Sequence, residues 1–356
     1  MADDLKIWPR LKRLMEYISA DPAIREAAVK GDEESVFRLV GKDALSAADL
    51  KEAISGILAY QYPNQRKTDM TENRFFDLLC AHDREIINRI KERYDDCTFR
   101  DPGMDRFNHS LYARTRVETP LLRSRPFIRY YPVMFELSEG CSVHCFFCAL
   151  DAGRLQKNFL FTPQNEELFR GVLEVTRELI GDMASSAACY LSTEPLDNPD
   201  YEKFLLRFKE IFGYYPQTTT AAAERDPKRM RGFMEQLGKE EMEHHALRFS
   251  VRSLQQFRQI MDLYTPEELE DVELLFNHME SDTRFSDSGR VRMLPDHVRE
   301  KLFLMNYSIV CLAGLCVNFA SGTLRWIEPE VPCDEYPLGY RILEETSFQT
   351  VEEYRQ

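Results

Sequence analysis

Residues 139–148 have the sequence EGCSVHCFFC, in which three cysteines stand at a C-x3-C-x2-C spacing. The stretch comes directly after an apolar, strand-like run at residues 131–138. Three closely spaced thiolates can hold three irons of a [4Fe-4S] cluster and leave the fourth iron open to a further ligand. Gly140 lets the backbone approach such a group closely. The spacing therefore predicts an iron–sulfur site made by Cys141, Cys145 and Cys148.

Zinc is the alternative metal for this loop, because His144 adds a fourth potential ligand to the three cysteines. His144 is adjacent to Cys145, and adjacent side chains rarely converge on one small tetrahedral ion. Iron–sulfur chemistry is therefore the preferred interpretation. A zinc-stabilised binding module, with its helical front half recruiting a partner, is the alternative from another functional class.

Apolar runs alternate with amphipathic helical segments on the C-terminal side of this loop. The predicted strands are residues 131–138, 187–192, 217–221, 247–251 and 272–277. The predicted helices are residues 164–180, 200–212, 227–237 and 254–263. This alternation predicts βαβ units and a mainly parallel sheet, open or closed into a partial barrel. In such folds functional residues gather at the C-terminal ends of the strands, which is where the cysteines lie.

The pattern divides the chain into four predicted domains. Residues 1–97 form a helical region, in which Asp21 and Pro22 predict the start of a helix. Residues 98–129 form a connector with seven arginines and three acidic residues, which binds either an acidic partner or the protein's own carboxylates. The α/β domain covers residues 130–300, and a C-terminal extension with β structure covers residues 301–356.

Composition narrows the classes of function. With 46 basic and 60 acidic residues the net charge of the 356-residue chain is −14, so it would repel nucleic acid and anionic membranes. The uncharged run at residues 302–324 contains Asn306 and Asn318, which favours two buried β segments that meet near Gly314 over a membrane helix. Nine cysteines behind an N-terminus without an apolar segment indicate reduced thiols and a cytoplasmic location.

The spacing C-x3-C-x-aromatic-C, with Phe147 as the aromatic residue after the first strand of a βα series, resembles the radical S-adenosylmethionine (SAM) enzymes. The resemblance implies a partial (βα)6 barrel, a [4Fe-4S] cluster and SAM bound to the open iron through its amino and carboxylate groups. In this family an electron donor such as flavodoxin or ferredoxin drives cleavage of SAM. The resulting 5′-deoxyadenosyl radical takes a hydrogen atom from the substrate.

The same resemblance implies the residues that contact SAM. Glu194, in the segment STEP at residues 192–195, matches the acid of the family's Gly-Gly-Glu-Pro motif, although the glycines are absent here. Ser250 and Arg252 match the contacts to the ribose and the carboxylate, and Thr219 stands where the cofactor cleft would pass. A helix-capping role is the alternative for Glu194.

The tail at residues 316–340 and the helical segment at residues 21–25 resemble the proteusin-type peptide epimerases. These enzymes convert L-residues to D-residues in ribosomally made precursor peptides. The resemblance implies a precursor peptide, leader plus core, as the substrate, with residues 1–97 and the arginine-rich connector as candidates for leader recognition. A different radical SAM maturase, one that forms carbon–carbon bonds, thioethers or rings, is the alternative.

In the epimerase mechanism a cysteine thiol returns hydrogen to the opposite face of the Cα radical. A thiol suits this step because its S–H group can lie in an apolar site without a strong hydrogen-bond partner. The donor must lie outside the cluster loop, since donor and adenosyl carbon flank the substrate. Cys333, in a turn-rich part of the tail, is the first candidate; Cys316 is the second and Cys311 the third. In the alternative maturase these three cysteines would hold a second cluster.

Overall fold

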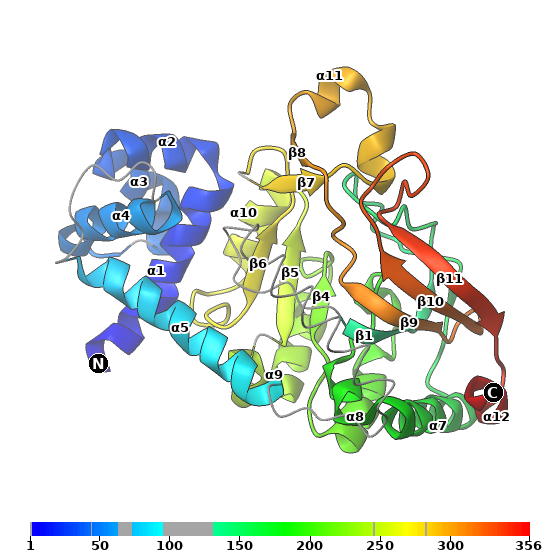
Figure 1. Cartoon of the computed structure of the whole chain (residues 1–356). Helices are drawn as coiled ribbons and strands as arrows, with labels where there is room; N and C mark the ends of the chain where they lie inside the picture. Colours follow the sequence, from blue (N-terminus) through cyan, green and yellow to red (C-terminus); the bar gives the residue numbers. More distant parts are fainter. Residues whose placement is uncertain (1, 44, 63–72, 95–130, 245, 282) are drawn as a thin grey trace. The chain divides into compact units, whose positions relative to one another are not determined.

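The computed structural model describes residues 2–43, 45–62, 73–94, 131–244, 246–281 and 283–356. The predicted connector at residues 98–129 and Cys97 lie outside these ranges. The chain divides into two compact units (Figure 1). The first unit contains Met1–Arg93 and Ala223–Thr283, and the second contains Tyr94–Ala222 and Arg284–Gln356. The predicted domain boundaries at residues 97, 129 and 300 stay predictions.

The first unit joins the N-terminal helices to a parallel pair of strands. Its elements are α1 Ala2–Ala20, α2 Pro22–Lys30, α3 Glu33–Val40, η1 Gly41–Asp43, α4 Ala47–Gln61, α5 Arg74–Tyr94, α9 Pro227–Glu243, β5 Leu247–Val251, α10 Leu254–Leu263 and β6 Glu273–Phe276. As predicted, Asp21 caps α2 by accepting a hydrogen bond from the Ala23 amide, and Pro22 occupies the first turn.

A buried arginine ties the N-terminal helices to the rest of the first unit. The Arg13 guanidinium donates to Asp43 at 2.9 Å and to the carbonyls of Met261 and Tyr264 at 3.1 and 2.9 Å. Its side chain is 1% exposed, so the charge is stable there only because the carboxylate and the carbonyls replace water. Residues 2–43 and α10 therefore share one core.

The second unit carries the cysteine loop. Its elements are β1 Tyr131–Glu136, β2 Ser138–Glu139, β3 Lys157–Asn158, α7 Pro163–Ile180, η4 Gly181–Ser186, η5 Pro195–Asp197, α8 Tyr201–Phe212, β4 Thr218–Thr220, β7 Arg284–Ser286, η6 Gly289–Met293, α11 Asp296–Arg299, β8 Phe303–Met305, β9 Leu312–Asn318, β10 Thr323–Pro329, β11 Tyr340–Ser347 and α12 Val351–Arg355. Its main sheet has the order β1-β9-β10-β11 (Figure 1).

β1 is the most buried strand of this sheet, with all six residues inside. It runs parallel to β9, while β10 is antiparallel to both β9 and β11. On its other side, Met134 and Ala188 form a parallel bridge, and Ala188 bridges Gln217 in the same sense. Phe135 packs edge-on against Phe169 of α7 and Phe208 of α8. These helices therefore cover one face of β1.

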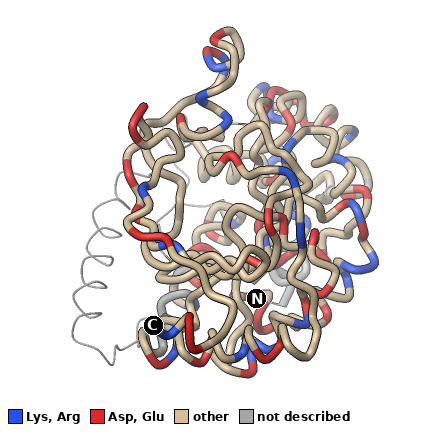
Figure 2. Tube along the Cα trace, turned by 90° about the vertical axis from the view of Figure 1, so that its right-hand side faces the viewer, with Lys and Arg blue, Asp and Glu red and all other residues tan. Residues whose placement is uncertain are grey.

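Most predicted elements are present, and the chain is mixed α/β as predicted. The helix at residues 254–263 matches its predicted bounds, but the strand predicted at residues 187–192 is reduced to the bridges of Ala188. The described strands fall into separate sheets and do not close into one barrel. Within the described residues no helix is both long and apolar enough to span a membrane. Acidic and basic residues are interspersed along the described trace (Figure 2).

The prediction that two buried β segments meet near Gly314 is wrong in two respects. The run at residues 302–324 does contain two complete strands, β8 and β9, but residues 306–311 separate them and Gly314 lies inside β9, and β8 is not buried. Gly314 has φ +150°, and a Cβ atom built on it would stand 2.0 Å from the Pro132 carbonyl oxygen. The glycine is thus a point of close approach between β1 and β9, next to the irregularity in their register.

Replacing Gly314 by Ala is therefore expected to destabilise the fold by about 1–3 kcal/mol or more, because the added methyl group must displace a backbone carbonyl. Urea unfolding followed by circular dichroism measures the change. Gly232→Ala is the control, since this helical glycine of α9 has nothing within 4 Å of the added Cβ and should gain up to about 1 kcal/mol. Equal stability of the two variants would contradict the proposed close contact.

Candidate active site

The cysteine loop leaves the sheet at β2 and folds back onto β3. β2 and β3 pair antiparallel, and the Cys141 amide donates to the Gly153 carbonyl at 2.9 Å. Gly140 has φ +80°, and a Cβ atom there would lie 2.1 Å from the Arg154 carbonyl oxygen. A glycine is therefore required at position 140 because the loop's own backbone passes so close to it. This contact, and not an approach to a cofactor, explains why the position holds glycine.

The three predicted ligands share this loop, and each is half-buried. The Cys148 amide donates to the Cys145 carbonyl at 3.3 Å, and the exposed His144 has φ +55°. Burial raises the pKa of the Cys141 thiol, and the charge of Glu194 adds to the rise. Within the described part of the chain no three His, Cys, Asp or Glu side chains converge closely enough for a metal ion. By donor chemistry, three thiols on one loop fit a cluster with one open iron.

Asp197 joins the cysteine loop to the turn that contains Glu194. Its carboxylate accepts hydrogen bonds from the amide and the hydroxyl of Ser142, at 2.7 and 2.5 Å. Its backbone carbonyl accepts a further bond from Asn158 of β3 at 2.9 Å. The residue directly after Cys141 is thereby fixed to η5. Sequence reasoning missed Asp197, although it stands only three residues after Glu194.

Glu194 is 3% exposed, and its carboxylate is hydrogen-bonded within the protein. It accepts from the Thr220 hydroxyl at 2.5 Å, the Ala221 amide at 2.8 Å and the Leu196 amide at 3.1 Å. The last contact caps η5, so the capping alternative is confirmed as a structural role. Burial outweighs these donors and raises the pKa of Glu194 to about 7. The same carboxylate links the turn after residue 192 to the end of β4.

The other predicted SAM contacts are divided between the two units. Thr219 of β4 belongs to the second unit, with its hydroxyl 2.7 Å from that of Tyr190. Ser250 and Arg252 belong to the first unit. There the Ser250 hydroxyl accepts from Asn277 at 2.9 Å, and Arg252 pairs with Glu224 at 3.1 Å. The second unit thus brings together the cysteine loop, Glu194 and Thr219.

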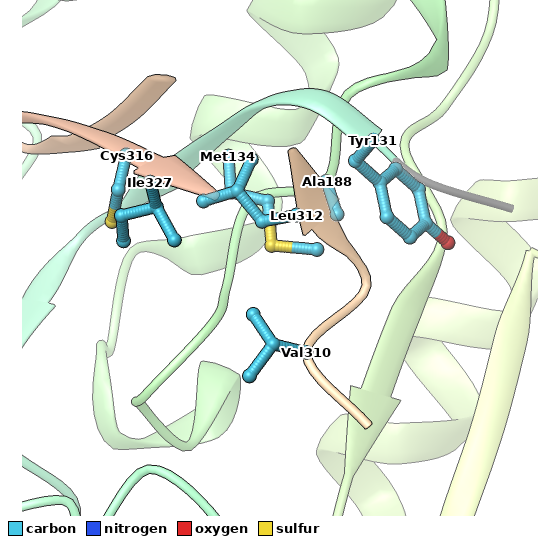
Figure 3. Close-up of a cluster of buried hydrophobic side chains, with 7 residues drawn as sticks. All are labelled: Tyr131, Met134, Ala188, Val310, Leu312, Cys316 and Ile327. Carbon is cyan, nitrogen blue, oxygen red and sulfur yellow. The ribbon is translucent and has the colours of Figure 1, made fainter. Parts of the chain in front are cut away.

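The three candidate donor thiols differ in exposure. Cys333 is exposed, and its sulfur accepts from the Tyr336 amide at 3.4 Å within a tight turn. Cys316 is 4% exposed and lies in a core cluster beside Ile327 and Met134 (Figure 3). Cys311 is half-buried at the edge of the same cluster. Of these thiols, Cys333 is the most exposed to solvent.

A second buried carboxylate, Glu136, was not found by sequence reasoning. It is 3% exposed at the end of β1. It accepts from the amide and hydroxyl of Ser192, both at 2.6 Å, and from Asn318 at 3.1 Å. The Cys316 sulfur lies 3.7 Å from Oε2, the oxygen that accepts from Asn318. Burial and the nearby negative charge raise the pKa of that thiol. The sequence feature that could have indicated this residue is the acid at the end of the apolar segment YPVMFE.

Comparisons with known proteins add limited information. No family model matches the sequence. Over 241 residues, 65% of this chain, it is 36% identical to the "Uncharacterized protein y4wI" of Sinorhizobium fredii. That alignment covers 46% of the relative, so the chain spans about half of its length. Among solved structures, it is similar to the "Crystal structure of BtrN in complex with AdoMet and 2-DOIA", with TM-score 0.36 and 16% identity over 55% of this chain and 72% of that chain. A TM-score this low does not establish a common fold.

Replacing Glu194 by Gln is expected to remove a pH-dependent loss of stability. The pKa of Glu194 rises from its ordinary value of 4.5 to about 7 on folding, so between these values the folded state holds more protons than the unfolded state. The free energy of unfolding therefore falls as pH rises through this window, by ~3 kcal/mol at most. Urea unfolding from pH 4.5 to 7.5 measures the slope.

The exposed Glu167 of α7 provides the control, because Glu167→Gln removes one charge without touching the buried network. The profile of E194Q should be flatter than that of E167Q across the window. Parallel profiles would show that Glu194 is ionised in the folded chain well below pH 7.

Proposed function

We propose that this protein is a radical SAM enzyme in which Cys141, Cys145 and Cys148 hold a [4Fe-4S] cluster and SAM binds beside it. The observation that carries the proposal is the loop of three half-buried thiols after β1, fixed by Asp197 to the turn of Glu194. The parallel bridges from β1 through Ala188 to Gln217, and the parallel pair β5–β6, support a partial (βα)6 barrel.

The bound cluster and SAM supply a carbon-centred radical that can take a hydrogen atom from an unactivated C–H bond. The chain's own residues bind SAM and orient it. Glu194, already held by Thr220 and two backbone amides, offers its remaining acceptor capacity to the amino group of SAM. Thr219, in the same unit, is proposed as a further contact to SAM. Ser250 and Arg252, in the first unit, stay predicted contacts to the ribose and the carboxylate. Arg252 brings a positive charge suited to a carboxylate.

We further propose that the substrate is a residue of a ribosomally made precursor peptide, which is converted from the L to the D form. The Cα–H bond breaks, and a new Cα–H bond forms on the opposite face with hydrogen from a cysteine S–H bond. One electron from a flavodoxin- or ferredoxin-type donor and one proton from solvent then restore the thiol. The exposed thiol of Cys333 is the proposed hydrogen donor, since a peptide must reach it.

We propose the helical region at residues 1–97 and the arginine-rich connector at residues 98–129 as the two candidates for leader recognition. We place the enzyme in the cytoplasm, where its nine cysteines stay reduced.

Replacing Cys141, Cys145 and Cys148 together by Ala should abolish iron binding and the formation of 5′-deoxyadenosine, because no other thiols of the loop can hold the cluster. Iron content after anaerobic reconstitution measures the first effect, and chromatography of the nucleoside measures the second. Cys80→Ala, at a half-buried cysteine of α5, should keep about four irons per chain.

Other iron counts would point to the alternatives. About eight irons per chain in the wild type would indicate a second cluster and favour a ring- or bond-forming maturase. A colourless, zinc-containing wild type would contradict the radical SAM assignment and favour the binding module. A triple variant that still makes 5′-deoxyadenosine would contradict the ligand assignment.

Replacing Cys333 by Ala should abolish D-residue formation while 5′-deoxyadenosine continues to form, because only the second hydrogen transfer uses this thiol. Stability should change by less than about 0.5 kcal/mol, since the side chain is exposed. In heavy water the wild type should place one deuterium at each inverted Cα, because thiol protons exchange with solvent. Chiral amino-acid analysis and mass spectrometry of the peptide measure both effects.

Cys316→Ala is the matched comparison for the donor assignment. If C333A still epimerises and C316A does not, the donor is Cys316. Peptide products with a mass change but no deuterium at Cα would contradict epimerisation and favour the ring-forming alternative.

A further inference from the structure

Arg290 holds the backbone of the cysteine loop from outside it. The residue belongs to η6, far along the chain from the cysteines. Its guanidinium donates to the Cys145 carbonyl at 3.0 Å, to the Asp151 carboxylate at 3.0 Å and to the Ala152 carbonyl. Its backbone amide donates to the Cys148 carbonyl at 3.0 Å. One residue thus binds the backbone carbonyls of two of the three proposed iron ligands.

The residue before it shows how closely the two segments fit. Gly289 has φ +51°, and a Cβ atom there would lie 2.4 Å from the carbonyl oxygens of both Cys148 and Ala149. Any side chain at this position would push η6 away from the loop. The amide of Gly289 also donates to the Pro337 carbonyl at 2.8 Å. η6 is therefore anchored on the tail as well as on the cysteine loop.

Apolar contacts reinforce the same pairing. Phe146 and Phe147, the two residues between Cys145 and Cys148, pack with a small core cluster of Phe285, Val291 and Leu302. The rings of Phe146 and Phe147 lie 5.6 and 6.1 Å from that of Phe285, measured between centroids. The segment around η6 thus supports the loop through side chains and through backbone hydrogen bonds.

The chemistry of arginine suits this task. Its planar guanidinium carries five N–H donors in a fixed fork and cannot lose its charge at physiological pH. The Arg290 side chain is 13% exposed, so its bonds are largely protected from competing water. A lysine could reach one or two of the same acceptors but could not reproduce the fork.

We propose that Arg290 is a positioning residue for the iron–sulfur site: its guanidinium holds the carbonyls of Cys145 and Ala152 on either side of Cys148, and so sets the direction in which the Cys145 and Cys148 thiols project. Arg290 does not contact iron or SAM in this role. The inference rests on the proposed function, because it concerns the geometry of the proposed ligands.

The test compares full-length Arg290→Gln with Arg292→Gln. Arg292 stands two residues away on the same 3-10 helix, but its guanidinium pairs with Asp287 and the exposed Asp334 and not with the cysteine loop. In the apoprotein, the rate at which iodoacetamide alkylates Cys145 and Cys148 is followed by mass spectrometry of the peptides. R290Q should be alkylated several-fold faster than R292Q, because the half-buried thiols are exposed when the loop loosens.

Reconstituted protein provides the second readout. R290Q should bind less iron and give a broadened electron paramagnetic resonance spectrum of the reduced cluster with a shifted midpoint potential, while R292Q should match the wild type. R290K should fall between them. Thermal unfolding of each variant separates these effects from a general loss of stability, which alone would not change the spectrum of the clusters that do form.

Alkylation rates and cluster spectra of R290Q that equal those of R292Q would overturn the proposal. Should R290Q not fold, the variants Asp151→Asn and R290K test the proposal in its place. Asn tolerates the φ of +44° at position 151. Asp151→Asn therefore removes only the charged partner of Arg290. Both must then shift the spectrum in the direction expected for R290Q; unchanged spectra overturn the proposal. A wild type that binds no iron contradicts the proposed function instead, and the alkylation rates still decide whether Arg290 holds the loop.

Discussion

The parallel pairing of β1 is the constraint on which the candidate site depends. β1 has β9 on one side and the Ala188 segment on the other, both parallel to it, and Ala188 in turn bridges Gln217 at the start of β4. The carboxyl ends of parallel strands meet at the same edge of a sheet. The cysteine loop, the turn of Glu194, Thr220 and Asn318 each follow or end one of these segments. Their proximity is a consequence of strand direction, before any side-chain contact is made.

Two buried carboxylates organise this edge in different ways. Glu136 ends β1 and draws in the amide of Ser192 and the side chain of Asn318, so it links the three neighbouring segments. Glu194 accepts hydrogen bonds from Thr220 and Ala221 at the end of β4. Burying a carboxylate is costly unless hydrogen bonds replace its water. Each acid is therefore stable only where hydrogen-bond donors surround it, which ties the neighbouring segments together at this edge.

The cysteine loop is held by neighbouring segments as well as by its own hydrogen bonds. Asp197 fixes it beside Cys141, and Arg290 fixes it beside Cys145 and Cys148. The loop thus has one support near Cys141 and another near Cys145 and Cys148. External supports of this kind would keep the proposed ligands in place around a metal. The tail that contains Cys333 is joined to the same supports through Gly289.

The sequence alone determined what depends on near neighbours. Residues within a few positions of one another set the cap of α2 by Asp21 and the bounds of α10, so the sequence pattern predicted both. The cysteine spacing of the loop is itself a local feature of the sequence. Only the tertiary structure decided the burial of Cys316 and the position of Gly314 inside β9. It also decided the hydrogen bond from Arg290 to the Cys145 carbonyl, which joins residues 145 positions apart. Such contacts arise where strand direction brings distant segments together, and no local pattern records which carbonyl a distant arginine will meet.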